Sequence, residues 1–170
     1  WNEMKHQTDI GFGQQICSVG RELLLPYGKA VQGEERLHLL ETLQNQAANC
    51  TDKAALRELD ACIAVLERGD RVLPQTRTVT VAACDLGSRL LLALPFEVAS
   101  ADGAQLEKEA ERLLGKPAHL ICYCGGYDGY LPSGAPLSAE SSYEDIASRY
   151  LPQSREQVWE CAKQCVMDVI

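Results

Sequence analysis

The sequence has no long apolar run and no cluster of basic residues. No hydrophobic stretch in its 170 residues approaches the roughly 20 residues that a membrane-spanning helix needs, so no transmembrane segment is predicted. Lys and Arg number 16 against 24 Asp and Glu, which gives a formal net charge of −8. Because nucleic-acid-binding domains carry basic patches, this composition argues against nucleic acid as a partner.

The first residues also lack the features of a secretory signal. Residues 1–5, Trp-Asn-Glu-Met-Lys, have no basic region followed by an apolar segment, and the chain does not begin with Met. We therefore expect it to be cut from a larger protein and to work with the remainder of that parent chain. On this expectation the missing signal leaves the localisation open.

The cysteine spacing of a structural zinc site is absent as well. One residue separates Cys122 from Cys124 and three separate Cys161 from Cys165, and neither spacing is the CxxC of such sites. Mostly reduced thiols are expected, which favours a reducing compartment, although a disulfide or a zinc cluster remains an alternative. Four cysteines in apolar contexts are predicted to be buried: Cys17, Cys62, Cys84 and Cys122.

What is present is a composition typical of a folded domain. Hydrophobic residues make up 46% and charged residues 24% of the chain, and this length suits one domain with a real core. Hydrophobic periodicity predicts helices at residues 10–27, 34–48, 52–68, 105–114, 143–150 and 153–169, and strands at residues 76–82, 89–94 and 118–123. The first two strands should form a hairpin.

These elements predict a mixed α/β (α+β) fold in which helices pack on a small mixed sheet. Three strands are few for a complete sheet, so residues 1–170 are expected to be a single domain or the C-terminal fragment of a larger catalytic domain. Within it, residues 1–75 are a helical segment, residues 76–132 a hairpin, helix and strand, and residues 133–170 a loop and closing helices.

The strongest functional signal is the sequence Cys-Tyr-Cys-Gly-Gly-Tyr-Asp-Gly-Tyr-Leu-Pro at residues 122–132. Glycines that follow a strand indicate a sharp turn or a close backbone approach, and the tyrosines on such a turn can point their hydroxyls at one place. A second strand ends in Pro-Phe-Glu at residues 95–97. Ligands often bind at strand ends, so Glu97 and a nearby phenol could form half of a metal site.

The segments at residues 85–97, 123–132 and 143–144 resemble, in order and approximate spacing, the end of the catalytic domain of neutral/alkaline non-lysosomal ceramidases. In that family a hairpin strand runs into Pro-Gly-Glu, and Asn-Gly-Tyr-x-Gly-Tyr and then Tyr-Glu follow. The resemblance covers roughly residues 76–150. It implies hydrolysis of the amide of a lipid such as ceramide, with zinc-bound water as the nucleophile.

The same resemblance implies roles for individual residues. Glu97 and Tyr130 take the places of two zinc ligands, and Tyr143, which would lie beside the bound amide, is the candidate catalytic residue. Tyr127 and Tyr143 are the candidate substrate-binding residues. The histidine ligands of the family lie upstream, outside this chain, so zinc would need ligands beyond it. The chain's own histidines do not match them: His6, His38 and His119.

The sequence departs from the family pattern at two motif positions. Phe96 replaces the glycine before the glutamate, which is expected to add bulk beside the metal, and Gly125 replaces the asparagine. The loop between Tyr130 and Tyr143 also looks longer than usual.

Simpler explanations stay open for the site residues. Glu97 can be a solvated carboxylate, Tyr130 a turn filler, Tyr127 a packing tyrosine and Tyr143 the aromatic that begins a helix. Asp128 is favoured in a glycine-rich turn for backbone reasons alone. His119, inside an apolar strand, is expected to be a core histidine.

Two classes of function therefore remain. One is part of a zinc-dependent amidase, and the other is a non-catalytic ceramidase-like domain for binding or assembly. Under the first, Glu97, Tyr130 and Tyr143 should converge although they come from separate elements.

Overall fold

The computed structural model describes residues 3–9, 15–28, 31–68 and 75–169, and within these ranges it has a five-stranded sheet. The strands lie in sequence order: β1 (Glu3–Asp9), β2 (Gln15–Pro26), β3 (Thr76–Asp85), β4 (Leu90–Ala93) and β5 (Ala118–Ile121). The first four pair antiparallel, whereas β5 runs parallel to β4. The sheet is therefore mixed, and the predicted α/β class is confirmed.

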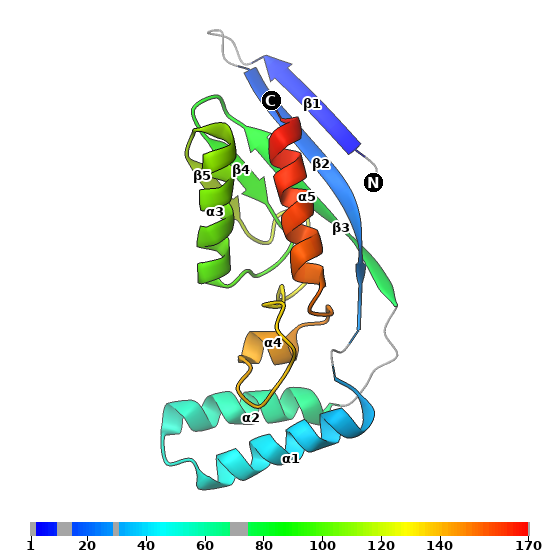
Figure 1. The fold of residues 1–170 in the computed structure, drawn as a ribbon, viewed down its shortest axis with the longest axis vertical. Helices are drawn as coiled ribbons and strands as arrows, with labels where there is room; N and C mark the ends of the chain where they lie inside the picture. The colour runs from blue at the N-terminus through cyan, green and yellow to red at the C-terminus, as the bar shows by residue number, and fades with distance from the viewer. Residues whose placement is uncertain (1–2, 10–14, 29–30, 69–74, 170) are drawn as a thin grey trace.

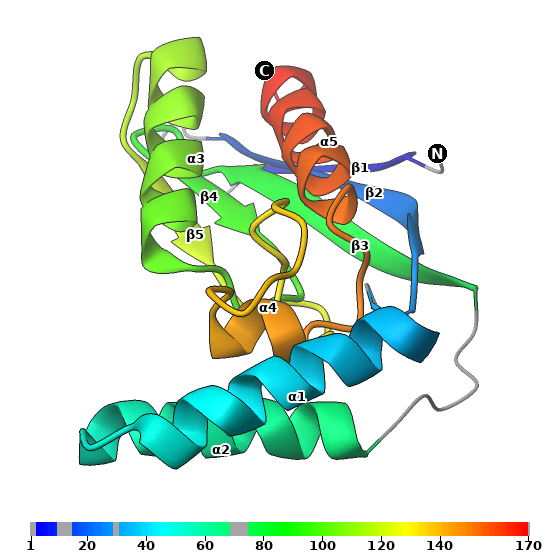
Figure 2. The same cartoon turned by 60° about the horizontal axis from the view of Figure 1, so that its bottom comes forward.

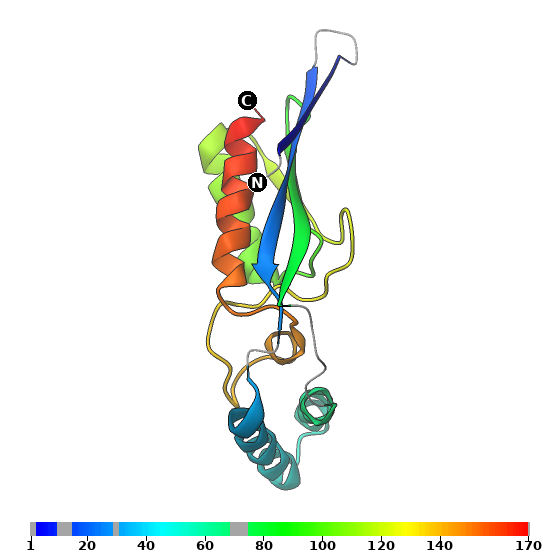
Figure 3. The ribbon, with the colours of Figure 1, turned by 90° about the vertical axis from the view of Figure 1, so that its right-hand side faces the viewer.

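The helices lie in two places (Figures 1 and 2). Helices α3 (Ser100–Leu114) and α5 (Ser154–Asp168) cover one face of the sheet, which Figure 3 shows edge-on. Helices α1 (Gly33–Asn49) and α2 (Lys53–Glu67) form a helical hairpin beyond the end of the sheet, and the short α4 (Tyr143–Ala147) lies between this hairpin and the sheet. No helix in the described ranges is both long and apolar enough to cross a membrane.

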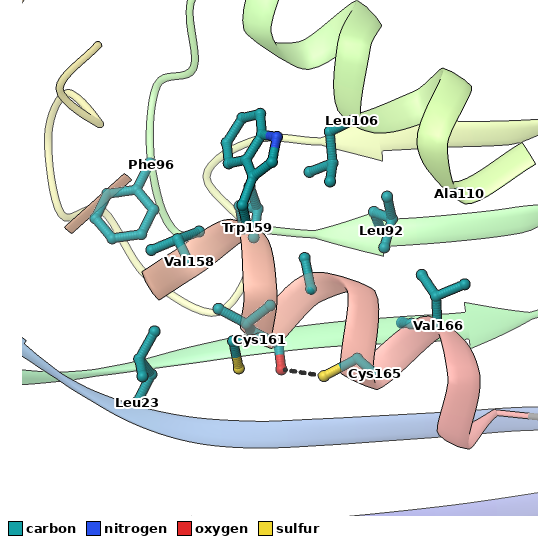
Figure 4. Close-up of a cluster of buried hydrophobic side chains, with 14 of the residues drawn as sticks. Leu23, Leu92, Phe96, Leu106, Ala110, Val158, Trp159, Cys161, Cys165 and Val166 are labelled. Carbon is teal, nitrogen blue, oxygen red and sulfur yellow. Dashed lines mark hydrogen bonds between the residues drawn. The ribbon is translucent and has the colours of Figure 1, made fainter. Parts of the chain in front are cut away.

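The main core lies between the sheet and α3 and α5 (Figure 4). Alternate residues of three strands enter it, as in a sheet with one buried face: Val19, Leu23 and Leu25 of β2, Val79, Val81 and Ala83 of β3, and Leu90 and Leu92 of β4. Helix α5 contributes two buried thiols, and the Cys165 thiol donates to the carbonyl oxygen of Val81 at 3.6 Å. The face of the sheet under α3 and α5 is therefore apolar and closely covered.

A second, smaller core holds the helical hairpin together and ties it to α4. It consists of Leu39, Leu43, Cys62, Leu66 and Ile146, and Tyr143 is partly buried against it. The predicted helices at residues 34–48 and 52–68 are confirmed in α1 and α2. The side chain of Tyr143 is therefore positioned by residues that are far from it in sequence.

The predicted helix at residues 10–27 is wrong where the structure describes it, because residues 15–26 form strand β2; residues 10–14 lie outside the described ranges. The apolar positions of this segment fit both periods. In the sheet Leu23 and Leu25 are buried and Leu24 between them is 60% exposed, which is a period of two. Pairing with β1 and β3 on both sides outweighs the local helical pattern.

Two smaller expectations also need correction. Of the four cysteines predicted to be buried, Cys62 alone is, while Cys17, Cys84 and Cys122 are half-buried. All eight cysteines lie in the described part of the chain as free thiols. His119 is exposed, not a core residue, and its Nε2 lies 3.1 Å from a guanidinium nitrogen of Arg89, since its position on β5 points away from the covered face.

Candidate functional site

The end of β4 brings Glu97 beside the tyrosine-rich segment. The Glu97 amide donates to the Gly129 carbonyl oxygen at 2.9 Å, and the Leu131 amide donates to the Glu97 carbonyl oxygen at 3.0 Å. Glu97 and Tyr130 thereby form a parallel β-bridge. Glu97 and Tyr130 are therefore held next to each other by backbone hydrogen bonds.

Backbone hydrogen bonds also fix the turn between β5 and this bridge. The Cys124 amide donates to the Leu94 carbonyl oxygen at 3.0 Å, and the Asp128 amide donates to that of Pro95 at 2.8 Å. Gly125 and Gly129 have φ values of +76° and +74°, a region that glycine enters without strain and asparagine more easily than most residues. Glycine at position 125 therefore permits the backbone conformation that this turn adopts. The turn between β5 and the bridge projects away from α3 and α5 (Figure 3).

Asp128 does more than suit a turn. Only 9% of its side chain is exposed; it pairs with the Arg77 guanidinium and accepts a hydrogen bond from the Tyr150 hydroxyl at 3.1 Å. Burial, followed by the charge of Asp128, raises the pKa of Tyr150. The contacts of Asp128 connect the turn to β3 and to Tyr150, which lies between α4 and α5.

Phe96 enters the core instead of crowding the metal-ligand position. Its side chain is fully buried, and its ring lies edge-on to that of Tyr150, with centroids 5.2 Å apart and planes at 87°. Phe96 lies in the bend that follows β4, and it faces the core while Glu97 remains half-exposed. The expectation that Phe96 adds bulk beside the site is thus wrong.

Tyr123 is the site residue that the sequence did not reveal. Its hydroxyl donates to Oε2 of Glu97 at 2.5 Å, and this hydrogen bond raises the pKa of Tyr123 to about 12. Its φ of +58° is the only positive value at a non-glycine residue in the described ranges, and such outliers cluster at functional sites. The sequence predicted it as the last residue of a strand; its place in the tyrosine-rich run was the only signal.

The remaining tyrosines extend the cluster. The rings of Tyr123 and Tyr127 stack with centroids 5.4 Å apart and planes at 25°, and those of Tyr130 and Tyr143 meet edge-on at 5.9 Å. Burial and the nearby charge of Glu97 raise the pKa of Tyr130. Glu97, Tyr130 and Tyr143 thus form one chain of contacts, while their chemical roles stay predictions. Tyr127 is 67% exposed.

These groups do not make a zinc site by themselves. In the described part of the chain, no group of three or more His, Cys, Asp or Glu side chains could hold a metal ion. Glu97 and Tyr130 offer two oxygens, whereas zinc sites commonly use at least three protein ligands with nitrogen or sulfur donors. His38 is exposed on α1 and His119 lies against Arg89. A zinc ion here would need ligands beyond Glu97 and Tyr130, and the described residues do not bring further ones to it.

Comparison with known proteins gives a likeness to two solved ceramidase structures. No family model matches the chain, and no curated protein matches it. A solved structure of a ceramidase complexed with C2 is 18% identical over 55% of this chain and 15% of its own, with a TM-score of 0.44. The neutral ceramidase of Pseudomonas aeruginosa is 16% identical over 99% of this chain and 27% of its own, with a TM-score of 0.45. The chain therefore spans a small part of the structures that it matches.

Proposed function

We propose that this chain is the C-terminal portion of a ceramidase-like, zinc-dependent amidase that hydrolyses an N-acyl, lipid-like amide. One observation carries the proposal: Glu97 pairs through its backbone with Tyr130, and the Tyr130 ring contacts that of Tyr143. These are the three residues to which the ceramidase-like motifs assign metal and substrate contacts. They come from a strand end, a glycine-rich turn and the first residue of α4.

In this proposal Glu97 and Tyr130 supply two oxygen ligands and the parent chain supplies nitrogen ligands. A zinc ion held in this way lowers the pKa of its bound water to about 7. Tyr143 and Tyr127 would contact the amide and its substituents. The pKa of Tyr130 is raised above its ordinary value near 10, so the phenol stays protonated at neutral pH until a metal is in place.

The proposal predicts that this chain alone folds but does not hydrolyse amides. Two oxygens, one of them a protonated phenol, should bind zinc weakly. In the full-length parent, Glu97→Ala should abolish metal-dependent amide hydrolysis measured by release of fatty acid from ceramide. Glu140→Gln, in the exposed loop before α4, is a matched control that should retain activity. Ceramide hydrolysis by this chain alone with added zinc would contradict the fragment hypothesis.

One observation favours a second candidate, a non-catalytic ceramidase-like domain for binding or assembly. The Glu97 carboxylate already accepts the hydroxyl of Tyr123, so this carboxylate has a structural partner without any metal. Metal analysis of the purified parent separates the two candidates. A parent that contains zinc in a ratio near one per chain supports the amidase, whereas a metal-free parent that binds the lipid amide without cleaving it supports the binding domain.

A further inference from the structure

We propose that the surface formed by Glu97, Tyr123, Tyr127, Tyr130 and Tyr143, here called the tyrosine cluster, binds an organic ammonium cation. The carboxylate would supply the charge and the ring faces the cation–π contacts. This proposal does not rest on amide hydrolysis, because it requires neither a metal nor residues outside this chain.

The charges around the tyrosine cluster favour a cation. Burial raises the pKa of Tyr130, and so do Glu97, Tyr143, Tyr127 and Glu144. Besides burial, the main groups that raise the pKa of Tyr123 and Tyr130 in the described part of the chain are carboxylates and other phenols. The nearby Arg77 is paired with Asp128. The negative charge of Glu97 therefore has a phenol, not a cation, as its observed partner.

The rings present faces as well as edges. Tyr127 is 67% and Tyr123 48% exposed, and the two stack on each other. The faces of aromatic rings are electronegative, and they attract ammonium groups within about 6 Å of the ring centre. The hydrogen bond from Tyr123 to Glu97 keeps this stacked pair next to the carboxylate. Tyr123 makes this contact from an unusual backbone conformation, with φ at +58°.

The same features favour an organic cation over a bare metal ion. A metal ion needs several oxygen, nitrogen or sulfur donors at once, and no group of three or more His, Cys, Asp or Glu is available in the described residues. Alkylated ammonium groups are weakly hydrated and are the ligands that aromatic cages recognise. A carboxylate hydrogen-bonded to one phenol, with the rings of three further tyrosines linked to it by contacts, matches that chemistry.

The test compares choline with its neutral isostere 3,3-dimethylbutan-1-ol, titrated into the full chain and followed by NMR chemical shifts of its tyrosine rings. Choline should bind saturably and shift the Tyr123 and Tyr127 resonances, while the isostere should bind more weakly. Tyr127→Leu removes the ring but keeps an apolar side chain, and should weaken choline binding roughly two- to fivefold. Tyr127→Phe keeps the ring face and should bind as the unmodified chain does.

Two further variants isolate the charge. Glu97→Gln should weaken choline binding without affecting the isostere, and the remote Glu140→Gln should change neither. Equal binding of choline and the isostere, shifts that do not saturate, or unchanged choline binding in both Tyr127→Leu and Glu97→Gln would overturn the proposal. Such a result leaves the amidase proposal standing, since that proposal depends on the metal content and hydrolytic activity of the parent.

Discussion

Replacing Phe96 by alanine tests whether this residue supports the fold from beneath the site. Its side chain is fully buried at the end of β4, and its ring packs edge-on against Tyr150. Truncating a buried Phe to Ala typically lowers the free energy of unfolding by about 3–5 kcal/mol, because less apolar surface is buried on folding and a cavity remains. The free energy of unfolding of a native protein is about 5–15 kcal/mol in total. The Phe96→Ala variant should therefore still fold, but with a much lower stability.

Urea unfolding, followed by far-UV circular dichroism and tryptophan fluorescence, measures this loss. Trp159 is buried in the same core (Figure 4) and reports on it directly. For a chain of this length the expected loss corresponds to a fall of roughly 6–20 °C in Tm. The slope of the urea transition should stay the same, since the variant changes stability and not the surface exposed on unfolding.

Leu24→Ala is the matched control for Phe96→Ala. Leu24 lies on the same sheet but is 60% exposed, and surface substitutions usually change stability by less than about 0.5 kcal/mol. A loss below about 1 kcal/mol for Phe96→Ala, or equal losses in the two variants, would refute the placement of Phe96 in the core. Such a result would instead support the expectation from the sequence that Phe96 lies beside Glu97 and adds bulk at the metal position.

Three further predictions concern hydrogen bonds and thiols. Asp128→Ala should cost about 1–3 kcal/mol in urea unfolding because the buried Tyr150 hydroxyl loses its acceptor, and the loss should shrink in a Tyr150→Phe background. Burial acts to raise the pKa of Asp168, but the hydrogen bond from Arg21 keeps it below its ordinary value near 4. The ionised Asp168 therefore stabilises the fold above that pH, and this stabilisation is lost as the pH falls through the lower pKa of the folded state. Asp168→Asn should accordingly lose less stability than the unmodified chain between pH 7 and pH 3. Thiol titration should count close to eight free thiols after denaturation, whereas in the native chain the exposed Cys124 should react first; a count of two or fewer would contradict the reduced state.

The helical hairpin and the β-hairpin were predictable because their signals are local. The apolar residues of α1 and α2 recur at helical spacing, and residues 76–82 alternate and are rich in β-branched side chains. Strand β2 was not predictable in this way, since its apolar residues fit a helix equally well. Of its two partners, β3 is distant in sequence and β1 has a weak strand pattern of its own. Local periodicity contains no information about such pairing.

The site shows the same division between local and distant information. Glu97 and Tyr130 could be expected near each other because one follows a strand and the other a glycine-rich turn. The hydrogen bond from Tyr123 to Glu97 could not be expected, since Tyr123 has a positive φ, a conformation that residues other than glycine ordinarily avoid and that the sequence does not signal. The direction of Phe96 could not be predicted either, because this residue lies in a bend beyond β4 and packs against Tyr150, which is distant in sequence.

The tyrosine cluster lies where the two hydrophobic cores meet, and this explains how residues from such separate elements are aligned. The turn that carries Tyr130 belongs to the main core, through Asp128, Tyr150 and Phe96. Tyr143 belongs to the core of the helical hairpin. The edge-on contact of Tyr130 with Tyr143, together with the Ser148 hydroxyl donating to the Tyr130 carbonyl oxygen at 3.0 Å, joins them. The hairpin, which has no motif of its own, thus positions one wall of the cluster.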